Sequence, residues 1–182
     1  MLQPISTERL LIRPFEAGDW SQVLECASDP EVMEYIPEGV LTAAAARAFV
    51  TENMTEGAEA YALVGQGEDG VVGHMIFHPW FAVRTYEIGW VLHKAHHGKG
   101  YATEAARALL KHGFENMDLH RIVATCQPEN RVSYRVMEKL GMRRESHFRK
   151  CIYRGGDVWW DEYFYAILEE EWQQMSSEGR VP

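Results

Sequence analysis

The sequence predicts an α+β domain built on one mixed β-sheet, and three observations lead to this prediction. The length of 182 residues suits a single domain with one core, which we expect to span residues 1–182. Apolar residues make up 46% and charged residues 25% of the chain, close to the averages for a globular domain, which disfavours disorder. The expected order is strand, two helices, three strands, helix, strand, helix and two strands, so about seven strands are flanked by about four helices.

The N-terminal part of the chain is expected to form one strand and two helices. Residues 8–15 are short and apolar, and Pro14 marks the end of this strand. Asp19 can cap a helix over residues 19–27, whose apolar residues recur at helical spacing. Thr42 can cap a second helix that carries one apolar stripe.

Three consecutive strands are expected next, at residues 60–65, 71–78 and 84–92. The glycine-rich segment of residues 65–70 joins the first two as a hairpin. A helix over residues 98–114 follows, with alanines on one face that would let its backbone approach a sheet closely.

The remaining elements are a strand, a helix and two long strands. Residues 121–126 form a short buried strand, and Asn130 opens a helix for which Gly141 is placed as the C-terminal cap. Residues 143–154 and 158–168 form two strands joined by a glycine-rich turn. Residues 169–175 are helical and polar.

Charge and cysteine content limit the classes of partner and compartment. With 18 Lys and Arg against 27 Asp and Glu, the net charge of -9 argues against nucleic acid as a partner. The cysteines Cys26, Cys126 and Cys151 are odd in number and widely spaced, which indicates reduced thiols in a cytoplasmic protein. The sequence shows no secretory signal and no apolar run long enough for a membrane span.

A glycine motif after the third strand of this group predicts an anion site. Residues 87–92 lead into His96-His97-Gly98-Lys99-Gly100-Tyr101-Ala102, where a helix begins, so backbone N–H groups and the positive end of the helix dipole face one place. Four Lys and Arg residues against one Glu give residues 94–111 a local net charge of +3. The spacing fits neither a P-loop nor a dinucleotide-binding fingerprint, and a purely structural turn stays open.

A second segment, Asn130-Arg131-Val132-Ser133-Tyr134 through Gly141-Met142, follows the strand at residues 121–126. Together with residues 7–14 at the start and residues 160–172 at the end, it resembles the GNAT superfamily of N-acetyltransferases. Within that superfamily the chain resembles the RimJ/RimL-like branch, which acetylates the N-termini of ribosomal proteins. The resemblance covers nearly the whole chain and implies a mixed, mostly antiparallel sheet whose central parallel strands are splayed.

The resemblance also implies that acetyl-CoA is the co-substrate. No metal is expected, because no Cys or acidic residue completes a ligand set with His93, His96 and His97. The cofactor would lie in the opening between the strands at residues 84–92 and 121–126. Its pantetheine would pair with the backbone of Val91 and Leu92, and Asn130 would contact the pantetheine or cap its helix. The pyrophosphate would bind the N–H groups of His97, Gly98, Lys99, Gly100, Tyr101 and Ala102. The sequence departs from the family at Ala95, where an Arg or Gln is common.

Two residues are the candidates for acid–base catalysis. An acceptor amine must lose a proton before it attacks, and Glu87 is placed on an alternating strand where it can remove that proton. The family resemblance makes Ser133 the donor to the departing thiolate, because Met137 stands where many members have a Tyr. Tyr134 is an alternative donor, Ser133 and Asn130 can equally cap a helix, and an isolated Glu can simply be solvated.

The acceptor is expected to be an amine of unspecified kind, either a peptide N-terminus or a small molecule. Residues 29–39 contain four acidic and no basic side chains and line the acceptor side in the family, which favours a cation, although a solvated surface explains them equally well. A non-catalytic acyl-CoA-binding or regulatory module on the same fold is the alternative function. The aromatic content of 12% is compatible with a homodimer.

Overall fold

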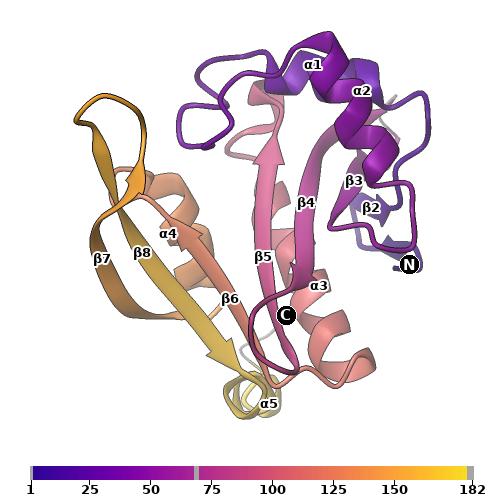
Figure 1. Ribbon diagram of the computed structural model, residues 1–182. Coiled ribbons are helices and arrows are strands. Elements are labelled where there is room, and N and C mark those ends of the chain that lie inside the picture. The colour runs from indigo at the N-terminus through magenta and orange to yellow at the C-terminus, as the bar shows by residue number, and fades with distance from the viewer. Residues whose placement is uncertain (1, 68–69, 180–182) are drawn as a thin grey trace. The chain divides into compact units, whose positions relative to one another are not determined.

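The computed structural model describes residues 2–67 and 70–179. Its eight strands form one sheet in the order β1-β2-β3-β4-β5-β6-β8-β7 (Figure 1). Pairing is antiparallel in five of its ladders, from β1 through β4 and between β6, β8 and β7. It is parallel between β5 (Thr85–Leu92) and β6 (Arg121–Cys126). Five α-helices accompany the sheet, so the α+β class and the mostly antiparallel mixed sheet are confirmed.

The chain divides into two compact units. The first, called here the N-terminal unit, consists of Met1–His78 with Gly89–Ala108, and the second, the C-terminal unit, consists of Pro79–Ile88 with Leu109–Pro182. Strand β5 and helix α3 (Tyr101–Asn116) each contribute residues to both units. No helix in the described part of the chain is long and apolar enough to cross a membrane.

The N-terminal unit is a small sheet with two helices. Its elements are β1 (Ile5–Ser6), β2 (Leu10–Arg13), α1 (Trp20–Ala27), α2 (Ala43–Glu52), β3 (Ala60–Gly65), β4 (Val71–Pro79) and a 3-10 helix, η1 (Lys94–His96). Helices α1 and α2 lie side by side (Figure 1), and their buried Val23 and Val50 pack with Phe15 and the alanines of β3. This apolar cluster attaches the helix pair to the sheet.

The start of the chain differs from the predicted strand at residues 8–15. The backbone N–H of Thr7 donates to the carbonyl of Leu10 at 2.8 Å, so residues 7–10 form a turn and β2 begins only at Leu10. Residues before the turn form the unpredicted two-residue strand β1. A two-residue strand is too short to give an alternating pattern that could be recognised.

Of the two helix caps predicted in the N-terminal unit, Thr42 is confirmed and Asp19 is wrong. The Thr42 side chain accepts a hydrogen bond from the backbone N–H of Ala45, as expected for a cap. Asp19 occupies the cap position of α1 but makes no side-chain cap. Its buried carboxylate instead pairs with the Arg13 guanidinium at 2.8 Å, because two charges removed from water must compensate each other.

The C-terminal unit is built on antiparallel pairing of three strands. Its elements are β6, α4 (Arg131–Lys139), β7 (Arg143–Tyr153), β8 (Trp159–Leu168) and α5 (Glu169–Ser177). Strand β6 is paired along its whole length with the second part of β8, from Arg121 opposite Leu168 to Cys126 opposite Tyr163. Gly141 follows α4 with a φ of 80°, so the predicted glycine at this helix end is confirmed.

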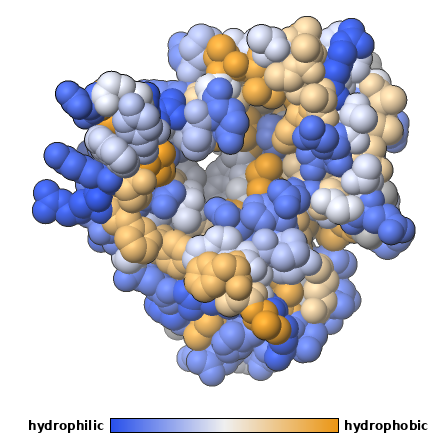
Figure 2. All heavy atoms as spheres, viewed as in Figure 1, coloured by the Kyte–Doolittle hydropathy of each residue, from blue (hydrophilic) through white to orange (hydrophobic). Residues whose placement is uncertain are grey.

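Strands β7 and β8 form a long hairpin with an exposed outer surface. Figure 2 shows hydrophilic residues there with apolar ones among them, and Phe148, Tyr153, Val158 and Trp159 are exposed. The predicted turn at residues 155–157 joins the two strands, and Gly155 and Gly156 both have a positive φ. In the earlier hairpin between β3 and β4, Glu68 and Asp69 of the predicted turn lie outside the described residues.

Candidate functional site

The glycine motif lies in the N-terminal unit, where it leads into α3. Gly98 and Gly100 have φ values of 74° and 84°, a left-handed conformation that glycine adopts without a steric penalty. For this reason α3 begins at Tyr101, three residues later than the predicted start. The first N–H groups of an α-helix have no partner within the helix, and the dipole is positive there. The segment from Gly98 to Ala102 therefore has the geometry of an anion site, whereas the N–H of His97 already donates to the Lys94 carbonyl at 3.1 Å. The bound anion itself stays a prediction.

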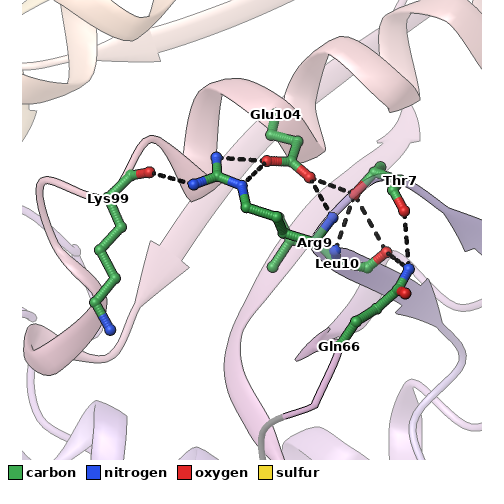
Figure 3. A network of polar contacts seen from close by, with 6 residues as sticks. All are labelled: Thr7, Arg9, Leu10, Gln66, Lys99 and Glu104. Atoms are coloured by element: carbon green, nitrogen blue, oxygen red, sulfur yellow. Dashed lines mark hydrogen bonds and ion pairs between the residues drawn. The ribbon is translucent and has the colours of Figure 1, made fainter.

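A polar network connects this glycine segment to the turn between β1 and β2 (Figure 3). The Arg9 guanidinium donates to the Glu104 carboxylate at 2.7 Å and to the Lys99 carbonyl at 3.0 Å. The Thr7 hydroxyl donates to the same carboxylate at 2.6 Å. Although partial burial acts in the opposite direction, these bonds lower the pKa of Glu104, which keeps it ionised at neutral pH.

The contact between Arg9 and Lys99 also sets the direction of one peptide bond. In a trans peptide the carbonyl and the following N–H point in opposite directions. Because the Lys99 carbonyl points to Arg9, the N–H of Gly100 points away from it. Sequence reasoning missed Arg9 and Glu104, since their hydrogen bond joins residues 95 positions apart and no local pattern signals it.

The basic and acidic segments that the sequence separates meet in the N-terminal unit. Lys94 Nζ lies 2.6 Å from a carboxylate oxygen of Glu31, and His93 lies 3.6 Å from Glu25. The positive charge of Lys94 is therefore compensated by one of the four acidic residues that we expected to face a cationic acceptor. The positive charge of residues 94–111 and the negative charge of residues 29–39 are therefore each partly neutralised by the other.

The end of β5 carries the two residues predicted to pair with the cofactor. Val91 is buried and packs with Cys26, Ala27 and Met33, which brings the segment of residues 29–39 against this strand. The carbonyl of Leu92 lies 2.9 Å from His97 Nε2. The imidazole of His97 therefore contacts the end of β5 at which the pantetheine is predicted to pair. Whether Val91 and Leu92 bind a cofactor stays a prediction.

The predicted base Glu87 lies in the C-terminal unit beside two residues that the sequence did not single out. The Thr125 hydroxyl donates to a Glu87 carboxylate oxygen at 3.5 Å, and it is also hydrogen-bonded to Glu162. All three side chains are half-buried. Burial raises the pKa of Glu162, the Thr125 hydrogen bond lowers it, and the charge of Glu87 raises it further.

The strand registers explain why these three side chains meet. Glu87 is opposite Val123 in the parallel pair, and Thr125 is two residues further along the same face of β6. Thr125 is opposite Phe164 on β8, two residues from Glu162 on the same face. Only the sheet order reveals this arrangement, so sequence reasoning could select Glu87 from its strand but had no signal for Glu162.

Ser133 and Asn130 lie at the start of α4 in the same unit. The Asn130 side chain accepts a hydrogen bond from the Ser133 backbone N–H at 3.1 Å, which confirms the capping role. The Ser133 side chain is hydrogen-bonded to the thiol of Cys126, whose pKa burial raises to about 12. Cys126 is a buried strand residue, as predicted, and Met137 is a core residue of α4.

The remaining polar candidates contribute packing. Tyr134 stacks edge-on against Tyr163 with ring centroids 5.9 Å apart. The His93 ring accepts a hydrogen bond from the backbone N–H of Ala95.

Over residues 2–67 and 70–179, no three His, Cys, Asp or Glu side chains come together in a way that could hold a metal ion.

Comparison with known proteins places these features in a wider context. A family model described as an acetyltransferase (GNAT) domain matches residues 9–143. The protein named "Uncharacterized N-acetyltransferase YnaD" from Bacillus subtilis (strain 168) is 57% identical over 168 residues, which cover 92% of this chain and 98% of that protein. The protein named "Uncharacterized N-acetyltransferase p20" from Bacillus licheniformis is 30% identical over 94% of this chain and 99% of its own. A crystal structure of an acetyltransferase (GNAT family) from Bacillus anthracis matches with a TM-score of 0.88 and 58% identity, over 92% of this chain and 99% of that chain.

Proposed function

Because the chain belongs to the GNAT acetyltransferase family, we propose that it transfers an acetyl group from acetyl-CoA to a primary amine by direct attack in a ternary complex. The observation that carries the proposal is the glycine segment, where Gly98 and Gly100 open α3 with positive φ values. This geometry suits a pyrophosphate, because the N–H groups and the positive dipole end at the start of a helix favour a bound anion.

The proposed cofactor contacts come from the glycine segment, the end of β5 and the start of α4. His97, Gly98, Lys99, Gly100, Tyr101 and Ala102 would bind the pyrophosphate through their N–H groups. Val91 and Leu92 would pair with the pantetheine, and the His97 ring would then release the Leu92 carbonyl that it now contacts. Asn130 would act by capping α4, which fixes the position of Ser133.

The proposed chemistry uses one base and one acid. An amine has a pKa of about 8 as an α-amine and about 10.4 as a lysine-like group, so Glu87 would remove its proton. The neutral nitrogen would then form a bond to the acetyl carbon while the carbon–sulfur bond breaks, with N–H groups near Val91 polarising the carbonyl. The Ser133 hydroxyl, which is hydrogen-bonded to the Cys126 thiol, would protonate the departing thiolate.

For the acceptor we propose a cationic amine, either a protein N-terminus or a small molecule. The RimJ/RimL-like pattern of residues 7–14 and 130–142 supports a protein N-terminus. The acidic residues of the segment 29–39 support a cation, with Glu31 already paired to Lys94. The free cysteines Cys26, Cys126 and Cys151 support a cytoplasmic location.

The first prediction concerns thiol release from acetyl-CoA over a panel of amines that includes N-terminal peptides. We expect release with at least one amine, and a loss of roughly hundredfold or more in kcat/KM for Glu87→Ala and Ser133→Ala, because each removes an acid–base group. Glu115→Ala, an exposed carboxylate on α3, is the matched control and should act as wild type. Thermal stabilisation by CoA without thiol release for any amine would instead support the non-catalytic binding module.

A further inference from the structure

Arg9 has no role in the proposed reaction, yet its side chain contacts the glycine segment directly. The guanidinium donates to the Lys99 carbonyl at 3.0 Å and to the Glu104 carboxylate at 2.7 Å (Figure 3). We infer that Arg9 is a positioning residue, which turns the peptide bond between Lys99 and Gly100 so that the Gly100 N–H points to the bound pyrophosphate. The inference rests on the proposed function, which places a pyrophosphate at this segment.

The backbone of the glycine segment does not fix the direction of this peptide bond by itself. A reversal of the peptide plane changes the ψ angle of Lys99 and the φ angle of Gly100. Gly100 has a φ of 84°, and a glycine adopts negative φ values about as readily as positive ones. A group outside the segment must therefore select one of the two directions.

The Arg9 guanidinium can make this selection because it only donates hydrogen bonds. The peptide bond between Lys99 and Gly100 is trans, so its carbonyl and its N–H point in opposite directions. In the observed direction the carbonyl accepts from Arg9 and the N–H lies on the other side. In the reversed direction the N–H would face a guanidinium, which has no atom that can accept it.

The turn that carries Arg9 is itself held in place by hydrogen bonds from β3. The backbone N–H of Gln66 donates to the Arg9 carbonyl at 2.7 Å, and the Gln66 amide donates to the Thr7 carbonyl at 2.8 Å. The Glu104 carboxylate accepts from the backbone N–H of Arg9 at 2.9 Å as well as from its guanidinium. Main chain and side chain of Arg9 are thus ordered without a ligand, which lowers the entropy cost of binding.

The charge of Glu104 makes the guanidinium more important. Glu104 lies in the first turn of α3, where an uncompensated carboxylate would repel a bound phosphate. Without Arg9 this carboxylate would also repel the Lys99 carbonyl oxygen and attract the Gly100 N–H. Loss of the guanidinium therefore favours the reversed peptide bond and weakens the anion site.

The substitution Arg9→Lys separates direction from charge. A lysine ammonium keeps the positive charge beside Glu104, but it is a single nitrogen and lacks the planar fork of N–H groups in arginine. It cannot bind the Glu104 carboxylate and the Lys99 carbonyl with the geometry of the guanidinium. Arg149→Lys, at an exposed position on β7, is the matched control.

The decisive experiment observes this one peptide bond by NMR. Lys99-Gly100 is the only Lys-Gly pair in the sequence, so lysine labelled with ¹³C at the carbonyl and glycine labelled with ¹⁵N give a single signal. This signal joins the Lys99 carbonyl to the Gly100 N–H. We expect CoA to shift the Gly100 proton downfield in the wild type. Arg9→Lys should move the Lys99 carbonyl upfield in the free protein and reduce the proton shift at saturation with CoA.

Two results of this experiment would overturn the inference. A Lys99 carbonyl signal that is the same in Arg9→Lys and in the wild type would show that the guanidinium does not hold the carbonyl. A Gly100 proton that bound CoA leaves unshifted would show that its N–H does not face the pyrophosphate.

Calorimetric affinities test whether the direction matters for binding. Arg9→Lys should raise the Kd of CoA roughly tenfold, the effect of one hydrogen bond from a charged group. The Kd of dephospho-CoA should rise by the same factor, because this ligand lacks only the ribose phosphate. Equal Kd values for Arg9→Lys and the wild type would contradict the inference. A loss for CoA but not for dephospho-CoA would assign Arg9 to the ribose phosphate and would contradict it as well.

Turnover supplies a readout that a general loss of stability would not give. Arg9→Lys should raise the KM for acetyl-CoA roughly tenfold at unchanged kcat. Acetyl-pantetheine lacks the pyrophosphate, so its kcat/KM should stay near that of the wild type. Equal losses with both substrates would show a merely structural role for Arg9.

The two proposals fail in different ways. The NMR and calorimetric measurements need no turnover. CoA binding without thiol release for any amine would refute the proposed transfer and leave the positioning role intact. Equal behaviour of Arg9→Lys and the wild type in an active enzyme would refute only the positioning role, and a wild type that binds no CoA would refute both.

Discussion

His74 is a titratable residue that lies buried among aromatic side chains. It lies in the core of the N-terminal unit with its ring centroid 5.0 Å from that of Phe49 and 6.4 Å from that of Phe15. Among the described residues its Nδ1 has no hydrogen-bond partner. Burial lowers the pKa of His74 from 6.5 to about 4, so the ring is neutral in the folded protein at neutral pH.

This burial predicts an acid-sensitive stability. His74 takes up a proton more readily in the unfolded chain, so stability is fully present above pH 6.5 and is lost as the pH falls toward about 4. We expect a loss of about 2 kcal/mol at about pH 5, measured by urea unfolding. His74→Leu should remove this part of the pH dependence, and the exposed control His120→Gln should retain it. Parallel pH curves for wild type and His74→Leu would contradict the prediction.

Residue-level prediction was possible where the signal was local. Glu87 and Ser133 could be selected because a strand pattern and a helix start surround them, and Asn130 proved to be the cap that its position suggested. Thr125 and Glu162 could not be selected, because their meeting depends on two strand registers. Roles for these side chains require the sheet order, which no short window of sequence contains.

Among the secondary-structure elements, the strands with clear patterns were predicted most accurately. Strands β3 and β6 have the predicted boundaries, Ala60–Gly65 and Arg121–Cys126. The predicted starts of β2 and α3 were too early. The turn at Thr7 delays the start of β2, and two glycines with positive φ delay the start of α3. Periodicity predicts that an element exists, whereas its ends depend on neighbouring groups.

Gly73 lies where the backbone of β4 comes close to that of β5. A Cβ atom at this position would lie 2.3 Å from the Val91 carbonyl oxygen and 2.9 Å from Leu92 Cα, both backbone atoms that cannot move independently. Gly73→Ala should therefore destabilise the protein by about 1–3 kcal/mol in urea unfolding and weaken CoA binding. Gly57→Ala is the control, because nothing lies within 4 Å of its added Cβ. Equal stability of the two variants would contradict this close approach.

At the scale of the whole molecule, the net charge of -9 acts on an anionic cofactor over a longer range than any single contact. The local cations compensate only in part, because Lys94 is paired with Glu31 and Arg9 with Glu104. Repulsion should therefore dominate the encounter at low salt. Added salt screens this repulsion, since the Debye length is about 10 Å at 0.1 M.

We expect the association rate of CoA, measured by stopped-flow fluorescence, to rise with ionic strength. Glu31→Gln should raise the rate at low salt more than Glu115→Gln, although both remove one negative charge, because only the first releases Lys94. A rate that falls with salt would indicate that the local cations steer the cofactor despite their partners.

The α+β class, the sheet type and the order of the α-helices and of the strands other than β1 were predicted from the sequence, since they depend on the succession of apolar patterns. The grouping of residues into two units was not, because β5 and α3 each contribute to both. Composition and periodicity contain no information about which strand of a sheet belongs to which cluster of contacts. The family match spans residues 9–143 and includes parts of both units.

The contact of Thr7 and Arg9 with Glu104 has a consequence for biosynthesis. The Glu104 carboxylate, which binds the turn between β1 and β2, follows Thr7 by 97 residues and Arg9 by 95, and the Lys99 carbonyl follows Arg9 by 90. On the ribosome, the glycine segment can gain this support only after the chain beyond Glu104 has emerged from the exit tunnel. Such distant closure is slow compared with local folding, so residues 7–10 of the nascent chain stay without this support until Glu104 has been translated and has left the tunnel.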